Sequence, residues 1–161
     1  MIHPLRNLLF GRPGAGGLDL TALNIQRGRD HGLPLYNDMR TTMGLKPVRS
    51  FSQLRRNAAL QESLHEAYGE VSNMDLWVGG LSERPLWKDG AQLGELFTAI
   101  VVRQFTDLRD GDRFWYQNYL EPDELERVSN TTLARVIRNN TSIGRELQSN
   151  VFFVKTHDMN Q

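Results

Sequence analysis

The chain has 161 residues, enough for one domain with a hydrophobic core, and it contains no cysteine, which excludes disulfides and thiolate chemistry. Lysine plus arginine equals aspartate plus glutamate at 19 each, so no net charge favours nucleic acid or an anionic membrane as a partner. No apolar run approaches the roughly 18 residues that a membrane span needs, and the N-terminus lacks the long apolar region of a signal peptide. Composition and charge therefore assign the chain to no particular cellular compartment.

Residues 1–17 are predicted to form a flexible N-terminal segment that ends in the glycine-rich loop GRPGAGG. A glycine-rich loop before a helix can bind phosphate through its backbone amides. No strand pattern precedes this one, and no Gly-Lys-Ser/Thr follows it, so we interpret it as a simple loop.

A helix is predicted over Asp19–His31, with Asp19 as a cap or first-turn acid and Gly32 as its stop. Helical spacing places five residues on one stripe of it: Leu20, Leu23, Asn24, Arg27 and His31. Asn24 on such a stripe has two interpretations. It bonds to the backbone or caps the helix, or it orients an imidazole or a cofactor group.

The charged end of this helix is predicted to fix the following turn. Arg29 and Asp30 are adjacent, so they cannot share a face, and we expect each to pair elsewhere. His31 suits the helix C-terminus. The four histidines have no metal-ligand spacing, so no metal site is predicted within the chain.

Two further helices are predicted from apolar spacing and glycine stops. The first begins after Pro34 and ends at Gly44. The second covers residues 51–69, with Ser52 as its possible cap and Gly69 near its end. Residues 71–86, which include two adjacent glycines, are expected to be compact and rich in turns.

The longest apolar run, Leu93–Phe105, predicts the most buried helix, ended by Asp110 and Gly111. In the following turn Arg109 and Arg113 are expected to pair with the neighbouring aspartates, over an aromatic anchor formed by residues 114–116.

Two helices are predicted near the C-terminus. One begins at Pro122 with acids in its first turn, and the other lies within residues 132–150. The sequence VFFV at 151–154 is expected to be a short strand or a packed extended tail. With no internal repeat visible, the chain is predicted to be mostly α.

Four stretches carry a resemblance beyond these patterns: GAGGLDLTALNIQRGRDHGLPLYNDMR, MDLWVGGLSE, LRDGDRFWYQN and IRNNTSI. In this order they resemble the C-terminal part of the animal-type haem peroxidases, the family of myeloperoxidase and peroxidasin. The likeness covers residues 5–153, and the cysteine-free sequence is more similar to the bacterial members. It implies that 1–161 is a single partial haem peroxidase domain, the C-terminal part of an all-α fold.

The resemblance implies a haem b or modified haem, reduction of hydrogen peroxide with oxidation of a small donor, and a role in the response to oxidative stress. It assigns Asn24 as the acceptor of a hydrogen bond from the proximal histidine, which holds the ring and makes it more basic. It places Arg27 at the haem edge as a propionate partner, with Leu20 and Leu23 against the porphyrin.

The family pattern has the proximal histidine upstream of this motif and the distal histidine and arginine further upstream, and no residue here matches them. We therefore expect the isolated chain to be inactive, with an upstream peroxidase fragment or a second copy as partner. The family is often extracellular. The alternative is a non-catalytic helical remnant or interaction module that has lost haem.

Overall fold

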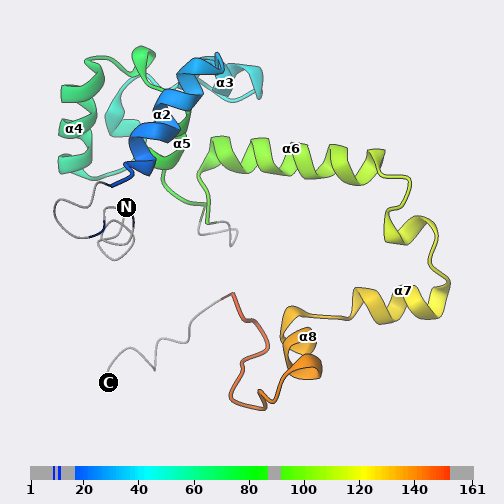
Figure 1. The fold of residues 1–161 in the computed structure, drawn as a ribbon. Coiled ribbons are helices and arrows are strands. Elements are labelled where there is room, and N and C mark those ends of the chain that lie inside the picture. Colours follow the sequence, from blue (N-terminus) through cyan, green and yellow to red (C-terminus); the bar gives the residue numbers. More distant parts are fainter. Residues whose placement is uncertain (1–8, 10, 12–16, 87–91, 153–161) are drawn as a thin grey trace. The chain divides into compact units, whose positions relative to one another are not determined.

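A computed structural model describes residues 9, 11, 17–86 and 92–152 of the chain, and the regular elements within them are helices joined by loops (Figure 1). The α-helices are α2 (Leu20–Asp30), α3 (Tyr36–Thr42), α4 (Ala58–Tyr68), α5 (Leu76–Ser82), α6 (Glu95–Gly111), α7 (Pro122–Ser129) and α8 (Leu133–Asn140). Short 3-10 turns are η1 (Phe51–Gln53), η2 (Val71–Asn73) and η4 (Tyr116–Asn118). The described residues form no strand, only an isolated bridge between Leu35 and Asp75, so the predicted mostly α class is confirmed.

The chain divides into two compact units, residues 1–107 and 108–161. The first unit contains the hydrophobic core, which consists of Tyr36, Phe51, Leu54, Leu64, Val71, Met74 and Leu96. These residues come from α3, α4, the two 3-10 turns and the start of α6, so short helices that are too small to be stable alone are held by packing on one another.

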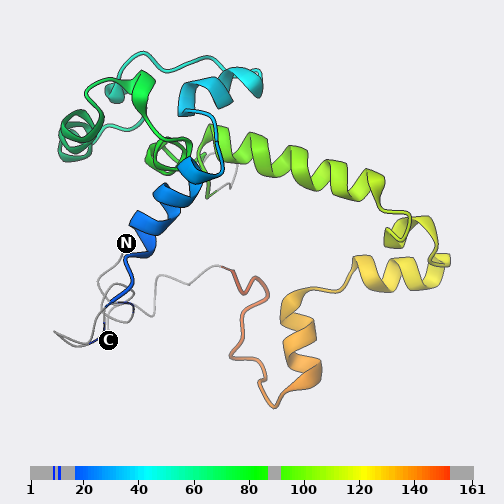
Figure 2. The same cartoon turned by 45° about the horizontal axis from the view of Figure 1, so that its top comes forward.

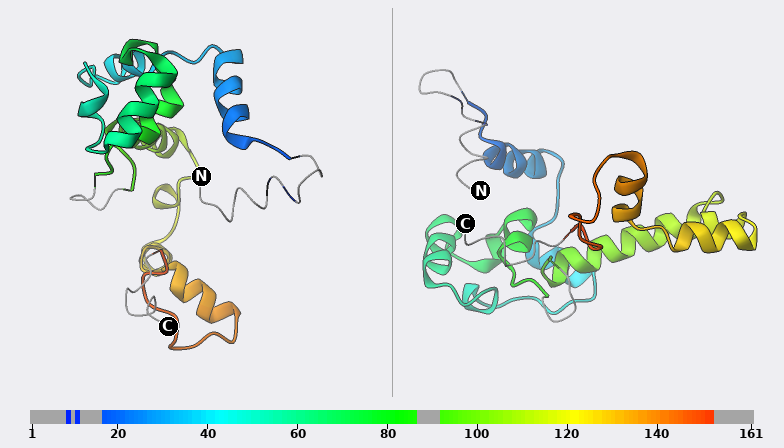
Figure 3. Two further views of the ribbon diagram at one scale, coloured as in Figure 1. Left: turned by 90° about the vertical axis from the view of Figure 1, so that its left-hand side faces the viewer. Right: turned by 90° about the horizontal axis from the view of Figure 1, so that it is seen from below.

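Helix α2 begins and ends as its sequence predicts. The Asp19 side chain accepts a hydrogen bond from the Ala22 amide at 3.0 Å, and Gly32 has the positive φ of 65° that suits a residue after a helix end. The helix buries none of its own residues. Figure 3 shows it beside the cluster of α3, α4 and α5 rather than within it.

The predicted single helix over residues 51–69 is wrong in its first part. Phe51–Gln53 is a 3-10 turn, and α4 begins only after Asn57, whose side chain accepts from the Leu60 amide at 3.0 Å. The Ser52 hydroxyl does not cap a helix, because it pairs with the Ser50 hydroxyl at 2.8 Å. The stop at Gly69 is confirmed by its φ of 70°.

The segment predicted to be rich in turns contains a helix, α5, which runs through Gly79 and Gly80. A Cβ at Gly79 would lie 2.3 Å from the Tyr36 ring, and one at Gly80 would lie 2.3 Å from the Phe97 ring. The two glycines therefore let α5 pack directly against aromatic rings of α3 and α6. The close packing offsets their low helix propensity.

Helix α6 is not the most buried helix, contrary to the prediction. Of its described residues only Leu96 is buried, and Val102 and Phe105 are 59% and 67% exposed. Figure 2 shows α6 as one uninterrupted helix. Its apolar residues after Ile100 are repeated at helical spacing, but they are not buried. Its end at Gly111 agrees with the predicted stop.

The second unit buries little. Helix α7 starts at Pro122 with acids in its first turn, as predicted, and the Thr132 hydroxyl caps α8. Arg109 pairs with Asp110 at 2.7 Å as expected, but Arg113 lies over the Phe114 ring instead of an aspartate.

Three remaining predictions concern the chain ends and the membrane. Residues 151–152 form a turn rather than a strand, and 153–154 lie outside the described residues, as does most of the GRPGAGG loop. No helix among the described residues is both long and apolar enough for a membrane crossing.

Candidate functional site

A cavity of about 620 Å³ lies between α2 and α5, within the first unit. It is lined by Leu20, Thr21, Asn24, Arg55, Asn57, Leu60, Trp77, Val78, Leu81 and Ser82. Its size falls in the range of small-molecule and cofactor sites, roughly 300–1,000 Å³. Five of these ten residues are aliphatic or aromatic, and the other five carry hydroxyl, amide or guanidinium groups.

The walls of the cavity come from three segments far apart in the sequence: α2, the start of α4 and α5. Helix α2 contributes Leu20 and Asn24, one turn apart, because residues four positions apart share a helix face. Helix α5 contributes Trp77, Val78 and Leu81 from the face opposite its glycines. An apolar ligand with a few polar groups at its edge suits such a lining.

The amide of Asn24 already takes part in one hydrogen bond. Its Oδ1 accepts from Arg27 Nη2 at 2.8 Å, between residues three positions apart on α2. A side-chain carbonyl oxygen has two lone pairs, so Asn24 can accept a second donor from the cavity side. Arg27 thereby fixes the position of the Asn24 oxygen and leaves its second lone pair able to accept another hydrogen bond.

The predicted site residues of α2 have different places. Leu20 and Asn24 line the cavity, and Arg27 is bonded to Asn24 without lining it. Leu23 is 46% exposed and is not part of the lining. His31 lies at the end of the helix, where its Nδ1 is 2.8 Å from the Arg27 carbonyl oxygen, in agreement with the predicted helix-end role.

The sequence interpretation missed the α5 wall. Trp77, Val78 and Leu81 precede or follow the glycine pair, and the glycines suggested turns rather than a helix. The signal that could have found them is the spacing of Trp77, Val78 and Leu81 at i, i+1 and i+4, which places them on one side of a helix.

A second group of side chains fastens α2 to the rest of the unit. Arg29 donates from Nε and Nη2 to the two carboxylate oxygens of Asp75, at 3.0 and 2.7 Å. Tyr68 donates its hydroxyl to Asp75 Oδ2 at 2.8 Å. The hydrogen bonds from Arg29 and Tyr68 lower the pKa of Asp75. Arg29 thus pairs away from its helix as predicted, while Asp30 accepts from Gln26 within it.

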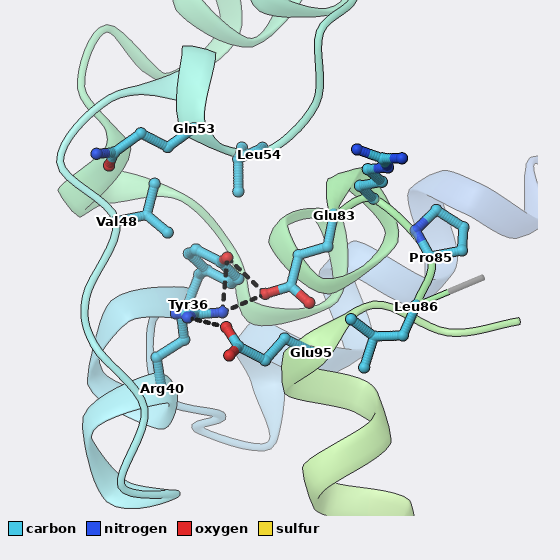
Figure 4. Close-up of a pocket in the computed structure, with 10 residues that line it drawn as sticks. Tyr36, Arg40, Val48, Gln53, Leu54, Glu83, Pro85, Leu86 and Glu95 are labelled. Atoms are coloured by element: carbon cyan, nitrogen blue, oxygen red, sulfur yellow. Dashed lines mark hydrogen bonds and ion pairs between the residues drawn. The ribbon is translucent and has the colours of Figure 1, made fainter. Parts of the chain in front are cut away.

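A third group surrounds a cavity of about 550 Å³ on the other side of α5 (Figure 4). Arg40 Nη1 donates to Glu83 Oε1 at 2.5 Å, and its Nη2 bonds to Glu95. Tyr36 donates its hydroxyl to the same Glu83 oxygen at 2.7 Å, and the other Glu83 oxygen accepts from the Leu96 amide. Since every buried polar side-chain atom of the described residues has a partner, we interpret this group as structural.

The phenols of Tyr36 and Tyr68 give the fold a predicted sensitivity to alkali. Burial, and then the hydrogen bond to Glu83, raise the pKa of Tyr36. Burial, and then the hydrogen bond to Asp75, raise the pKa of Tyr68 from 10.0 to about 12. The unfolded chain loses these protons first, so their contribution to stability is complete below pH 10 and is lost as the pH rises toward 12.

Urea unfolding at about pH 8 and about pH 11 measures this loss. Tyr68→Phe should reduce the difference in unfolding free energy between the two pH values. Tyr119→Phe, at a side chain that is 61% exposed, should leave it unchanged. The same difference in all three proteins would contradict the assignment.

The described residues contain no cluster of three histidine, cysteine or acidic side chains able to hold a metal ion. No histidine stands among the described residues that line the cavity between α2 and α5. Its apolar walls and its amide and guanidinium groups fit one side of a porphyrin. The described part of the cavity supplies no histidine for the iron.

Comparison with known proteins gives the chain its family. The family model for animal haem peroxidase matches residues 1–152. Peroxinectin A of Dictyostelium discoideum is 44% identical over 156 residues, which are 94% of this chain and 28% of that protein. Human myeloperoxidase is 40% identical over 161 residues, 97% of this chain and 21% of that protein.

Comparison with solved structures finds proteins of the same fold. Peroxidase A from Dictyostelium discoideum superposes with a TM-score of 0.78 at 43% identity, over 94% of this chain and 29% of that one. A fatty acid alpha-dioxygenase from Oryza sativa has a TM-score of 0.69 at 27% identity, over 80% of this chain and 22% of that one. The chain thus spans less than a third of these relatives. It belongs to the animal haem peroxidase family.

Proposed function

We propose that this chain forms the proximal side of a haem peroxidase site, as one partial haem peroxidase domain over residues 1–161. The observation that carries the proposal is the cavity in which Leu20 and Asn24 of α2 face the apolar side of α5. Haem peroxidases are the family to which the chain belongs, and haem is the cofactor of that family.

The residues of the cavity suit one side of a haem. Leu20, Leu60 and Val78 provide apolar contact for a flat ring, and Trp77 adds an aromatic surface. Arg27, held beside the cavity by Asn24, would bind a propionate through its planar guanidinium. We retain Leu23 as a contact at the ring's rim, where its partial exposure leaves it available.

When bound, haem of b type or a modified form supplies the reduction of hydrogen peroxide that is coupled to oxidation of a small donor. Asn24 accepts a hydrogen bond from the N–H of the proximal imidazole, which fixes the tautomer and the plane of the ring and makes the ring more basic. Arg27 holds the Asn24 oxygen in the accepting position. The proximal imidazole would come from a peroxidase segment outside the described residues.

Adding hemin to the purified chain tests the proposal. We expect a weak, broad Soret band, quenching of tryptophan fluorescence, and negligible peroxide-dependent oxidation of a dye. Leu81→Arg, which puts a charge into the cavity wall, should weaken hemin binding about tenfold or more. The matched control is Val102→Arg, at a similarly exposed aliphatic residue of α6 outside the cavity, and it should bind hemin normally.

The outcomes are distinct. Equal hemin affinity in Leu81→Arg and Val102→Arg would contradict the assignment of the cavity, and robust turnover by the chain alone would contradict the need for another segment. If an upstream peroxidase fragment restores activity, Asn24→Ala should lower the rate sharply in that complex.

The alternative function is a non-catalytic helical interaction module that has lost haem. The exposed apolar face of α6, with Phe105 at 67% and Val102 at 59%, is the observation that favours it. No change in the hemin spectrum, together with a dimer or larger assembly in size-exclusion chromatography, would support this alternative.

A further inference from the structure

We propose that Arg29, Asp75 and Tyr68 form a positioning cluster that sets the orientation of α2, and through it the place of Asn24 in the cavity. The residues act through Asn24 and do not themselves line the cavity. The part of the inference that concerns haem rests on the proposed function. The part that concerns the orientation of α2 stands without it.

Helix α2 depends on this cluster for its orientation, because the residues that it packs against α5 are only half-buried. None of its residues is buried, and Leu23 on its surface is 46% exposed. The other side-chain hydrogen bonds described for α2 and its caps, such as those of Asp19 and Gln26, stay within that segment. The two bonds from Arg29 cross to the start of α5, 46 residues away.

The geometry of the cluster can fix an angle as well as a distance. Each carboxylate oxygen of Asp75 accepts a hydrogen bond from the Arg29 guanidinium. Two parallel hydrogen bonds from this planar group restrict the rotation of one side chain against the other more than a single bond does. Tyr68 of α4 donates to Asp75 Oδ2, so the carboxylate itself is held from a third element. The Asp75 side chain is only 15% exposed, although that of Arg29 is 58% exposed.

Arg29 is well placed to orient Asn24. Arg29 lies five positions after Asn24 on α2, which is roughly 140° around the helix, so fixing one side directs the other toward the cavity. Beside the cluster, α2 and α5 leave a space of only about 20 Å³, room for about one water molecule. A rotation of α2 about its axis would therefore break the Arg29 bonds and move Asn24 out of the cavity wall.

The test uses the full chain, whose lack of cysteine permits specific spin labelling. Labels at Ala22→Cys on α2 and Ser63→Cys on α4, both exposed, report the distance distribution between the two helices. A narrow distribution is expected in the parent. It should broaden in Arg29→Gln and in Asp75→Asn, broaden less in Arg29→Lys, and remain unchanged in the control Arg103→Gln.

A second readout follows the cavity itself. In a background with Trp87→Phe and Trp115→Phe, quenching of Trp77 by hemin reports binding beside Asn24. Arg29→Gln should weaken it about five- to tenfold, because fewer molecules hold α2 in the binding orientation. Arg29→Lys should weaken it less, because lysine keeps the charge and one donor for Asp75. Circular dichroism should show the same helix content in each variant.

The two readouts separate the two ideas. A distribution that stays narrow in both Arg29→Gln and Asp75→Asn would overturn the positioning role. A broadened distribution with unchanged hemin affinity would overturn its link to the cavity. If the parent does not bind hemin at all, the proposed function fails, and the distance distributions still decide the orientation of α2.

Discussion

Replacement of Arg40 by methionine is expected to lower the free energy of unfolding by about 3–5 kcal/mol, the usual cost of breaking a buried ion pair by removing one partner. The Arg40 and Glu83 side chains are 7% and 6% exposed, so the remaining carboxylate stays away from water. It keeps the Tyr36 hydroxyl and the Leu96 amide as donors, and it loses its counter-charge. Urea denaturation followed by circular dichroism measures the loss.

A surface arginine provides the control. Arg103 is 67% exposed and lies 3.8 Å from Asp107, so Arg103→Met should change stability by less than about 0.5 kcal/mol. Adding Glu83→Gln to Arg40→Met removes the unpaired charge but keeps an acceptor for Tyr36. The double variant should recover part of the loss. A cost below about 1 kcal/mol for Arg40→Met would mean that the pair is dispensable.

Gly79→Ala is expected to destabilise the first unit by about 2 kcal/mol, even though alanine is the better helix former by about 1 kcal/mol. The new Cβ would lie 2.3 Å from Tyr36 Cδ2 and 2.8 Å from its Cβ. Tyr36 is fully buried, and its hydroxyl is held by Glu83, so its ring cannot move aside. Thermal and urea unfolding both report the effect.

Alanine substitutions at two other glycines provide comparisons for the loss of stability expected at Gly79. Gly80→Ala meets the ring of Phe97, which is only partly buried and can turn, so its cost should be smaller. Gly111→Ala, at the end of α6 with no atom within 4 Å of the added Cβ, should be neutral or stabilising by up to about 1 kcal/mol. Equal effects at Gly79 and Gly111 would show that packing on Tyr36 is unimportant.

Local physics made the ends of several helices predictable from the sequence. The Asp19 cap, the stops at Gly32 and Gly69, and the start of α7 at Pro122 each depend on one residue and its near neighbours. The start of α4 was missed because Asn57 and Ser52 are both chemically able to cap a helix. Only the fold decides which of them does.

Features that depend on distant residues were not predictable in this way. The close packing of Gly79 in α5 is against Tyr36, 43 positions earlier, and no local pattern contains that contact. The exposure of Phe105 was missed because an apolar run reports what a helix could bury, not whether a partner is present. In the candidate site, the stripe of Asn24 on α2 was predictable by periodicity, whereas the α5 wall opposite it required the packing of the whole unit.

The thinness of α5 has a thermodynamic consequence. The glycine side of α5 packs on the core and its other side lines the cavity, so only the width of this one helix separates the core from the cavity. The α5 wall of the cavity cannot open by local fraying without exposing Tyr36, so opening of this wall is part of the unfolding of the first unit. An occupant of the cavity should then protect the Tyr36 amide, which bonds to the Met74 carbonyl, from hydrogen exchange as strongly as it stabilises the whole unit.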